Sequence, residues 1–232
     1  MTEAEYQKSQ AELFARWKQA RPEYDNESEG KRFSLDGIQN FDAWENSIPK
    51  ILFLLKENRA PEDEWEPCQG INRDANPFSI NITRWRQLII DSYQKSPKEP
   101  SFSPLELPEH VNDIAIIEVK KLNEGKGSSS YNDIRYYARK DRDFIREQIE
   151  LINPDIIFCC STGDFYGDDI YGDEQWEHLV HDSRCDCYKH GNRLVIDFFH
   201  PSTRSGEKEK ELFDIINRMI RQAKVFEKFN WE

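Results

Sequence analysis

Four apolar runs of strand length limit most strongly what this chain can fold into. Each run is apolar at successive positions, as is typical of strands buried on both faces of a parallel sheet. Segments with helical periodicity separate the runs. The sequence therefore predicts an α/β fold: a three-layer α/β/α sandwich with a central, mainly parallel four-stranded sheet and right-handed crossovers. The predicted strands are residues 49–56, 113–119, 155–160 and 193–198.

Helical patterns fill much of the remaining chain. The predicted helices are residues 3–21, 41–46, 80 to near 97, 131–151 and 206–226. With 232 residues, 37% hydrophobic and 12% aromatic, the chain can bury one substantial core, and no change in composition marks a second one. We therefore expect a single domain over residues 1–232, with an N-terminal helical extension at about residues 1–35.

The composition indicates the cellular compartment of the protein and the classes of molecule that it could bind. The apolar runs are only strand-sized, and no basic region precedes an apolar one at the N-terminus, so we expect a cytoplasmic protein without a signal peptide or membrane contact. The five cysteines are an odd number, and Cys159 and Cys160 lie within an apolar strand, which fits a reducing compartment. The net charge of −12 opposes attraction to nucleic acid, although a local basic cleft can overcome it.

Ionisable residues follow three of the predicted strands. Glu57 follows the first, Glu118 lies near the end of the second, and His200 comes just after the last. Ligands of open α/β sheets bind at the carboxyl edge, where these residues are expected to lie. Two carboxylates and a histidine at this edge indicate an enzyme.

The three strand ends resemble motifs of the uracil-DNA glycosylase superfamily. The segments are Leu55-Lys56-Glu57-Asn58, Ile117-Glu118-Val119-Lys120 and Phe199-His200-Pro201-Ser202, and residues 148–157 are similar to a passage in divergent bacterial members. The resemblance covers about residues 36 to 221. It implies a monofunctional DNA glycosylase that flips a base, cleaves its N-glycosidic bond and leaves an abasic site, without a cofactor.

The resemblance also implies residue roles. Glu57 would polarise the attacking water or stabilise positive charge on the sugar, and His200 would donate a hydrogen bond to the departing base. Asn58 and Ser202 are substrate-binding candidates that also suit turns, and Ser202 could bind phosphate. The alternatives are an exposed carboxylate for Glu57 and a packed or solvent-facing ring for His200.

Glu118 departs from the family pattern, which has an asparagine there. An ionised glutamate only accepts hydrogen bonds, whereas asparagine also donates, so Glu118 would suit the exocyclic amine of cytosine better than the carbonyl of uracil. We therefore expect a modified cytosine to be favoured over uracil. The alternatives are a shifted register or a salt bridge to Lys120 or Lys121.

Further candidates would hold the base or the DNA backbone. Phe78 lies where the family places an aromatic ring that stacks on the base, although core packing is an equal alternative. Arg204 lies where the family inserts a wedge into the duplex, and an ordinary surface arginine is the alternative. Lys126 and Ser128 belong to a loop that could hold phosphate or be a plain linker.

A second group of residues could bind zinc. Imidazoles and thiols are zinc ligands, but this order matches no common zinc module, so we expect no metal and leave a zinc site as the alternative. The group comprises His178, His181, Cys185, Cys187 and His190.

The sequence thus favours a monomeric glycosylase that acts on DNA. A long polar loop at residues 59–76 suggests room for a bulky modified cytosine, and a role against modified phage DNA would follow from that specificity. One alternative is a non-catalytic module that binds nucleic acid or protein on the same fold. The other is a hydrolase of free nucleosides or nucleotides.

Overall fold

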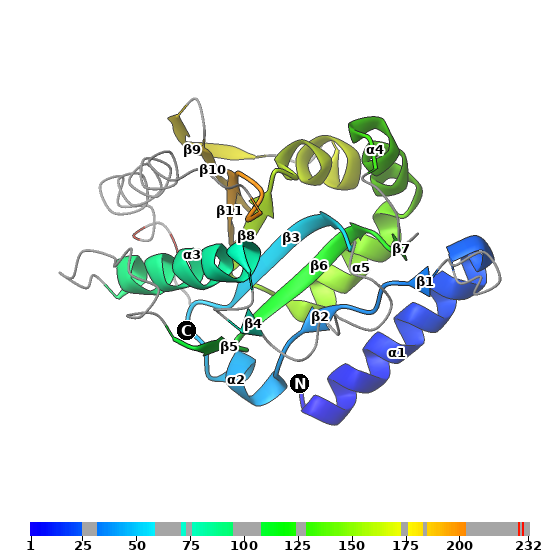
Figure 1. Cartoon of the computed structure of the whole chain (residues 1–232), viewed down its shortest axis with the longest axis horizontal. Helices are drawn as coiled ribbons and strands as arrows, with labels where there is room; N and C mark the ends of the chain where they lie inside the picture. Colours follow the sequence, from blue (N-terminus) through cyan, green and yellow to red (C-terminus); the bar gives the residue numbers. More distant parts are fainter. Residues whose placement is uncertain are drawn as a thin grey trace.

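A seven-stranded sheet forms the centre of the computed structural model (Figure 1). The structure describes residues 1–24, 32–58, 71–72, 76–94, 108–123, 129–172, 176–182, 185–202, 227 and 229. In spatial order the strands are β2 (Gly37–Ile38), β6 (Ile114–Lys120), β3 (Ile51–Glu57), β8 (Ile156–Cys160), β11 (Arg193–Phe198), β10 (Cys185–His190) and β9 (Glu177–Asp182).

The four predicted strands are the parallel centre of this sheet. β6, β3, β8 and β11 pair in parallel, which confirms the α/β fold. The predicted strand number of four was too low, because β2 pairs antiparallel with β6, and β10 and β9 continue the sheet antiparallel beyond β11. The added strands lack the continuous apolar pattern: β2 has two residues, β10 mixes polar with apolar residues, and β9 has two apolar residues flanked by polar ones.

The helices largely match the predicted ranges. They are α1 (Glu3–Ala20), α2 (Phe41–Glu45), α3 (Pro77–Tyr93), α4 (Tyr131–Lys140) and α5 (Arg142–Ile152), with a 3₁₀ turn at Pro22–Tyr24 and a π-helical segment at Phe165–Tyr171. Two small antiparallel pairs join β1 (Arg32–Phe33) to β7 (Leu122–Asn123) and β4 (Ile71–Asn72) to β5 (His110–Val111). The predicted helix at 206–226 lies outside the described residues. None of the described helices has the length and apolar character needed to cross a membrane.

The predicted helix at 131–151 is in fact two helices that meet at Asp141. The buried Asp141 carboxylate accepts hydrogen bonds from Arg21 Nε and the Tyr24 hydroxyl, both at 2.8 Å. Asp141 leaves the helical conformation, with φ −110° and ψ 10°. The apolar period continues across this break, so the pattern alone could not reveal it.

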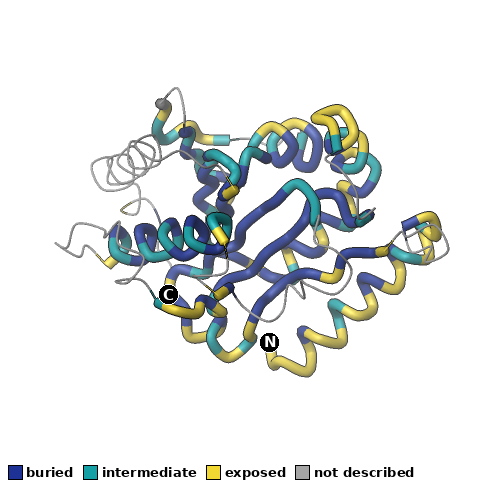
Figure 2. Tube along the Cα trace, viewed as in Figure 1, coloured by how far each residue is buried: buried dark blue, intermediate teal, exposed yellow. Residues whose placement is uncertain are grey.

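Helical residues pack on both faces of the sheet. On one face, Ile82 and Leu88 of α3 join Phe53 and Ile116 in one apolar cluster. On the other face, residues of α1, α4 and α5 join a second cluster that includes Leu54. Figure 2 accordingly shows the central strands buried along most of their length and exposed residues on the outer sides of the helices.

A buried ion pair fixes the end of β6. The carboxylate of Asp36 accepts hydrogen bonds from the Lys121 ammonium, from the backbone N–H of Glu118 at 2.7 Å and from Gln148 Nε2 at 2.7 Å. The Asp36 and Lys121 side chains are both 0% exposed. Burial lowers the pKa of Lys121, and the adjacent Asp36 opposes this effect. This pair joins the segment before β2 to β6 and α5.

We expect Asp36→Asn to lower the free energy of unfolding by about 3 kcal/mol or more, because it leaves the Lys121 ammonium buried without its counter-charge. Urea unfolding would measure the loss. Lys8→Ala, which removes an exposed pair with Glu12 within α1, should change stability by about 0.5 kcal/mol or less. Adding Lys121→Met to Asp36→Asn should recover part of the loss, and no recovery would contradict this explanation.

Candidate functional site

The three polar strand ends lie at one edge of the sheet. In the parallel register, Glu57 of β3 is opposite Lys120 of β6, and β8 lies between β3 and β11. With strands about 4.8 Å apart, the ends of β3 and β11 are about 10 Å apart along this edge. The sequence prediction that Glu57 and His200 follow strands of the same sheet, at the same edge, is confirmed.

Glu57 is held by a cation and a serine. Its Oε1 accepts the backbone N–H of Ser129 at 2.8 Å, and its Oε2 accepts the Ser129 hydroxyl and lies 3.7 Å from Lys120 Nζ. The Glu57 side chain is 7% exposed and that of Lys120 is 3% exposed. A cation and two donors stabilise the negative charge of this carboxylate despite its burial.

The same serine segment starts α4. Ser130 is the N-cap: its hydroxyl accepts the N–H of Asp133, and the Asp133 carboxylate accepts the N–H of Ser130. Because Ser129 binds Glu57, the start of α4 is tied to the end of β3. The predicted phosphate-binding residues Lys126 and Ser128, as well as Arg204, lie outside the described residues.

His200 lies in a defined turn after β11. The backbone N–H of Ser202 donates to His200 Nδ1 at 3.2 Å, and the carbonyl of Pro201 accepts Asn81 Nδ2 of α3 at 2.7 Å. A neutral imidazole that accepts at Nδ1 carries its proton on Nε2. In this tautomer the Nε2–H of His200 is a hydrogen-bond donor. Sequence reasoning missed Asn81, which could not be recognised without knowing that α3 packs beside this turn.

The remaining motif residues surround this arrangement. The Phe78 ring at the start of α3 lies 6.3 Å from the His200 ring, centroid to centroid, and Phe78 also packs against the α3-side cluster. Asn58 follows β3 directly and is partly exposed, and Ser202 is exposed. Both predicted uses of Phe78, packing and contact with a ligand beside His200, are compatible with this position.

Glu118 lies deeper in the protein than the other candidates. Its side chain is 1% exposed, and by strand alternation it faces the same side of the sheet as Ile116, the side covered by α3. The two lysines considered as its partners also bind other carboxylates, since Lys120 pairs with Glu57 and Lys121 with Asp36. Glu118 is thus a buried carboxylate beneath the α3 side of the sheet edge.

A pocket of about 380 Å³ opens at the same edge, beside Asp197. Gly163 is required here, because a Cβ at this position would lie 2.2 Å from the Asp197 carboxyl carbon. The Gly163 N–H instead donates to Asp197 Oδ1 at 3.1 Å. The pocket is lined by Lys56, Tyr131, Ser161, Gly163, Asp164, His181, Cys185, Asp186, Asp197, Phe198 and Phe199.

Asp197 is the most perturbed carboxyl group of this pocket that is described. Burial raises its pKa to about 6; the Gly163 N–H opposes this shift, the carboxylates of Asp164 and Asp186 add to it, and Lys56 opposes it. Sequence reasoning missed this residue. The available signal was a lone carboxylate inside the apolar run Val195-Ile196-Asp197-Phe198.

The structure divides the His/Cys group that could have formed a zinc site. Cys185 and Cys187 are buried in the α3-side cluster, and His190 stacks on Trp176 and accepts or donates at the Tyr166 hydroxyl. His178 and His181 lie elsewhere, beside Asp186. The described cysteines are free and buried, and burial raises the pKa of Cys159 and Cys160, which disfavours thiolate chemistry.

No family model matches the chain, and no curated protein matches it. The residues and their geometry therefore carry the functional argument.

The raised pKa of Asp197 predicts a pH dependence of the free energy of unfolding. Its pKa is about 6 in the fold and 3.8 without it, so the folded state binds more protons between these values and the free energy of unfolding falls as pH rises from about 4 to 6. Asp197→Asn removes this loss. The free energy of unfolding of the variant, relative to that of the unchanged protein, should rise by about 2 kcal/mol between pH 4 and pH 7. Urea unfolding with chelator present would measure this change. A difference that is constant with pH would contradict this.

Proposed function

We propose that this protein is a DNA N-glycosylase that hydrolyses the bond between a base and deoxyribose. The observation that carries the proposal is that a charge-stabilised carboxylate, Glu57, and a histidine, His200, whose Nδ1 accepts the Ser202 N–H, follow strands that end at one edge of the parallel sheet. The resemblance of the three strand-end segments to glycosylase motifs supports the same reaction.

The two residues suit the two halves of the hydrolysis. As the glycosidic bond breaks, its electron pair leaves with the base, and His200 Nε2–H stabilises the charge that develops on a base oxygen. Glu57 stabilises the positive charge on the sugar and orients the water whose oxygen bonds to the anomeric carbon. The water proton leaves by way of Glu57, and the base is protonated as it departs. The product DNA carries an abasic site.

The buried Glu118 supports a cytosine-type base. A carboxylate accepts from the exocyclic amine of cytosine and is repelled by a carbonyl oxygen. Glu118 lies one strand away from Glu57, opposite Leu55, so it belongs to the same end of the sheet. We include in the proposal a preference for modified cytosine, as in modified phage DNA, and a cytoplasmic, monomeric protein.

The activity test uses a panel of single-stranded and duplex DNAs with natural and modified bases. Mass spectrometry of released bases, together with alkaline cleavage at abasic sites, identifies the substrate. Release from free nucleosides but not from DNA would replace the proposal with a nucleoside hydrolase. Binding to DNA without release of any base would replace it with a binding module.

We expect Glu57→Gln and His200→Ala each to lower the single-turnover rate by about 100-fold or more, because each removes a charge or donor that acts in the transition state. Circular dichroism and thermal unfolding would verify the fold. Glu109→Gln and His110→Ala provide matched controls, since these neighbours are exposed on and next to the short strand β5. Unchanged rates in both active-site variants would exclude this mechanism.

We expect Glu118→Asn to weaken action on the cytosine-type base and to permit release of uracil, because the amide both donates and accepts. One well-placed contact of this kind discriminates by about 1–3 kcal/mol. Competition between two labelled duplexes would measure the change in preference. Efficient uracil release by the unchanged protein, with no release of any cytosine derivative, would show that Glu118 does not read the base.

A further inference from the structure

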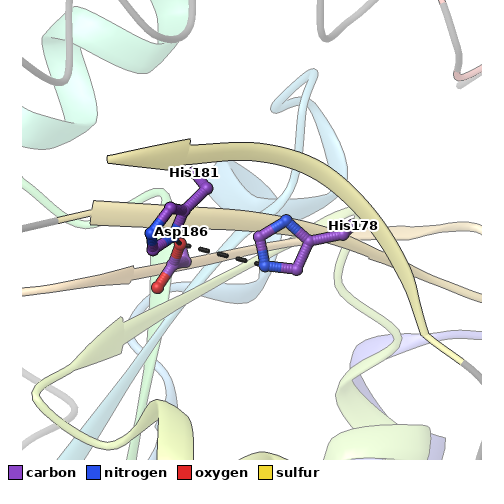
Figure 3. Close-up of side chains that lie close together, drawn as sticks. All are labelled: His178, His181 and Asp186. Atoms are coloured by element: carbon purple, nitrogen blue, oxygen red, sulfur yellow. Dashed lines mark hydrogen bonds and ion pairs between the residues drawn. The ribbon is translucent and has the colours of Figure 1, made fainter. Parts of the chain in front are cut away.

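Two imidazoles and a carboxylate converge on the ribbon formed by β9 and β10 (Figure 3). Asp186 Oδ1 lies 2.5 Å from His181 Nδ1 and 3.9 Å from His178 Nε2. One nitrogen or oxygen from each of the three side chains falls within 4.8 Å of the others. In Figure 3, both rings lie next to the Asp186 carboxylate.

An irregularity in the ribbon creates this convergence. His178 and His181 are three residues apart, so in a regular strand they would face opposite sides. Here the register shifts between Cys187 and Tyr188: His181 pairs with Asp186, and His178 pairs with Tyr188, two residues further along β10. Residues directly opposite share a face, so both histidines lie on the face of Asp186.

The ribbon holds the ligands without burying them. The His178 ring packs edge-on against Tyr188, with ring centroids 4.6 Å apart. The His178 and His181 side chains are 50% and 70% exposed. They can therefore rotate by the small amount that a shared ion would need, while the paired backbone of β9 and β10 stays in place.

The neighbouring pocket is acidic. His181 and Asp186 both line the pocket of about 380 Å³ at the sheet edge. Asp164 and Asp197 line it too, and Lys56 is the lysine among its lining residues. Three carboxylates against one ammonium favour a divalent cation at its wall.

We propose that His178, His181 and Asp186 bind a divalent transition-metal ion of the zinc type. Zinc takes imidazole nitrogen and carboxylate oxygen at about 2.0–2.2 Å, which places ligand atoms about 3.3 Å apart in a tetrahedron. The present separations of 2.5 and 3.9 Å lie on either side of this value. Two nitrogen ligands favour zinc over magnesium or calcium, which prefer oxygen.

The site has room for a fourth ligand. Three protein ligands leave one position of a tetrahedral ion for water or for an anionic group, as in zinc sites that act on ligands. Because two of the ligands also line the acidic pocket, a molecule bound there would lie beside the ion. The metal site stands independently of the proposed glycosylase activity, which rests on Glu57 and His200.

Calorimetric titration of the chelator-treated full chain with Zn²⁺ tests the proposal. We expect one ion to bind, and His178→Ala and His181→Ala each to weaken binding by about tenfold or more. His110→Ala, which removes an exposed histidine on β5, should leave the affinity unchanged. Thermal unfolding with chelator present should be the same for all four proteins, because the rings are exposed.

A second probe tests the ligand set. Co²⁺ in the site should give visible absorption bands of a four-coordinate ion with nitrogen ligands, and Asp186→Asn should change or abolish them. Mg²⁺ should not compete. Absence of Zn²⁺ binding, equal affinity in the two histidine variants and the unchanged protein, or tighter binding of Mg²⁺ than of Zn²⁺ would each overturn the proposal.

Discussion

The buried pair of Asp36 and Lys121 is the interaction on which the edge of the sheet depends. Asp36 also accepts the N–H of Glu118, so one carboxylate fixes the backbone of β6 just where the strand reaches the edge. Lys120 lies between Glu118 and Lys121 in the chain, and both of these residues are bound to Asp36. The Lys120 ammonium can therefore be held beside Glu57. A charge deep in the interior thus helps to position the lysine that lies beside the candidate carboxylate. Removal of the Asp36 charge would therefore disturb the sheet edge, although Asp36 itself is buried.

The lysines at this edge compensate carboxylates inside the protein. Lys120 and Lys121 are nearly or fully buried and pair with Glu57 and Asp36, so they contribute little positive potential to the outside. In an acidic chain this distinction matters, because the total charge of −12 says nothing about which charges are already neutralised locally. In the part of the edge that the structure describes, these two lysines would therefore add little long-range attraction for an anionic polymer, and contacts at short range through hydrogen bonds and shape would matter more.

The sequence predicted the parallel centre of the fold because burial on both faces leaves an unbroken apolar signature in β3, β6, β8 and β11. It did not predict β9 and β10, which lack an unbroken apolar run. Nor did it predict the break at Asp141, which depends on Arg21 and Tyr24 far away in the chain. Among candidate site residues, those next to strand ends could be found by position alone. Asn81 could not, since its role arises from packing between segments remote in sequence. Asp197 was missed although it is a lone carboxylate in an apolar run, because its contact with Gly163 is not visible in the sequence.

The register shift between Cys187 and Tyr188, which leaves Leu179 of β9 outside the pairing, has an evolutionary consequence. Strand parity is a counting rule, so a change of one residue in length transfers every side chain beyond it to the other face. A relative with one more residue between Asp186 and Tyr188 would pair Leu179 and make the ribbon regular. It would keep both imidazoles and lose their juxtaposition, with the ring of His178 directed toward the side on which Cys187 is buried. The ability of this ribbon to gather nitrogen ligands can therefore be gained or lost by insertion or deletion, with no exchange of one amino acid for another. Conservation of ribbon length would then be as informative as conservation of the histidines themselves.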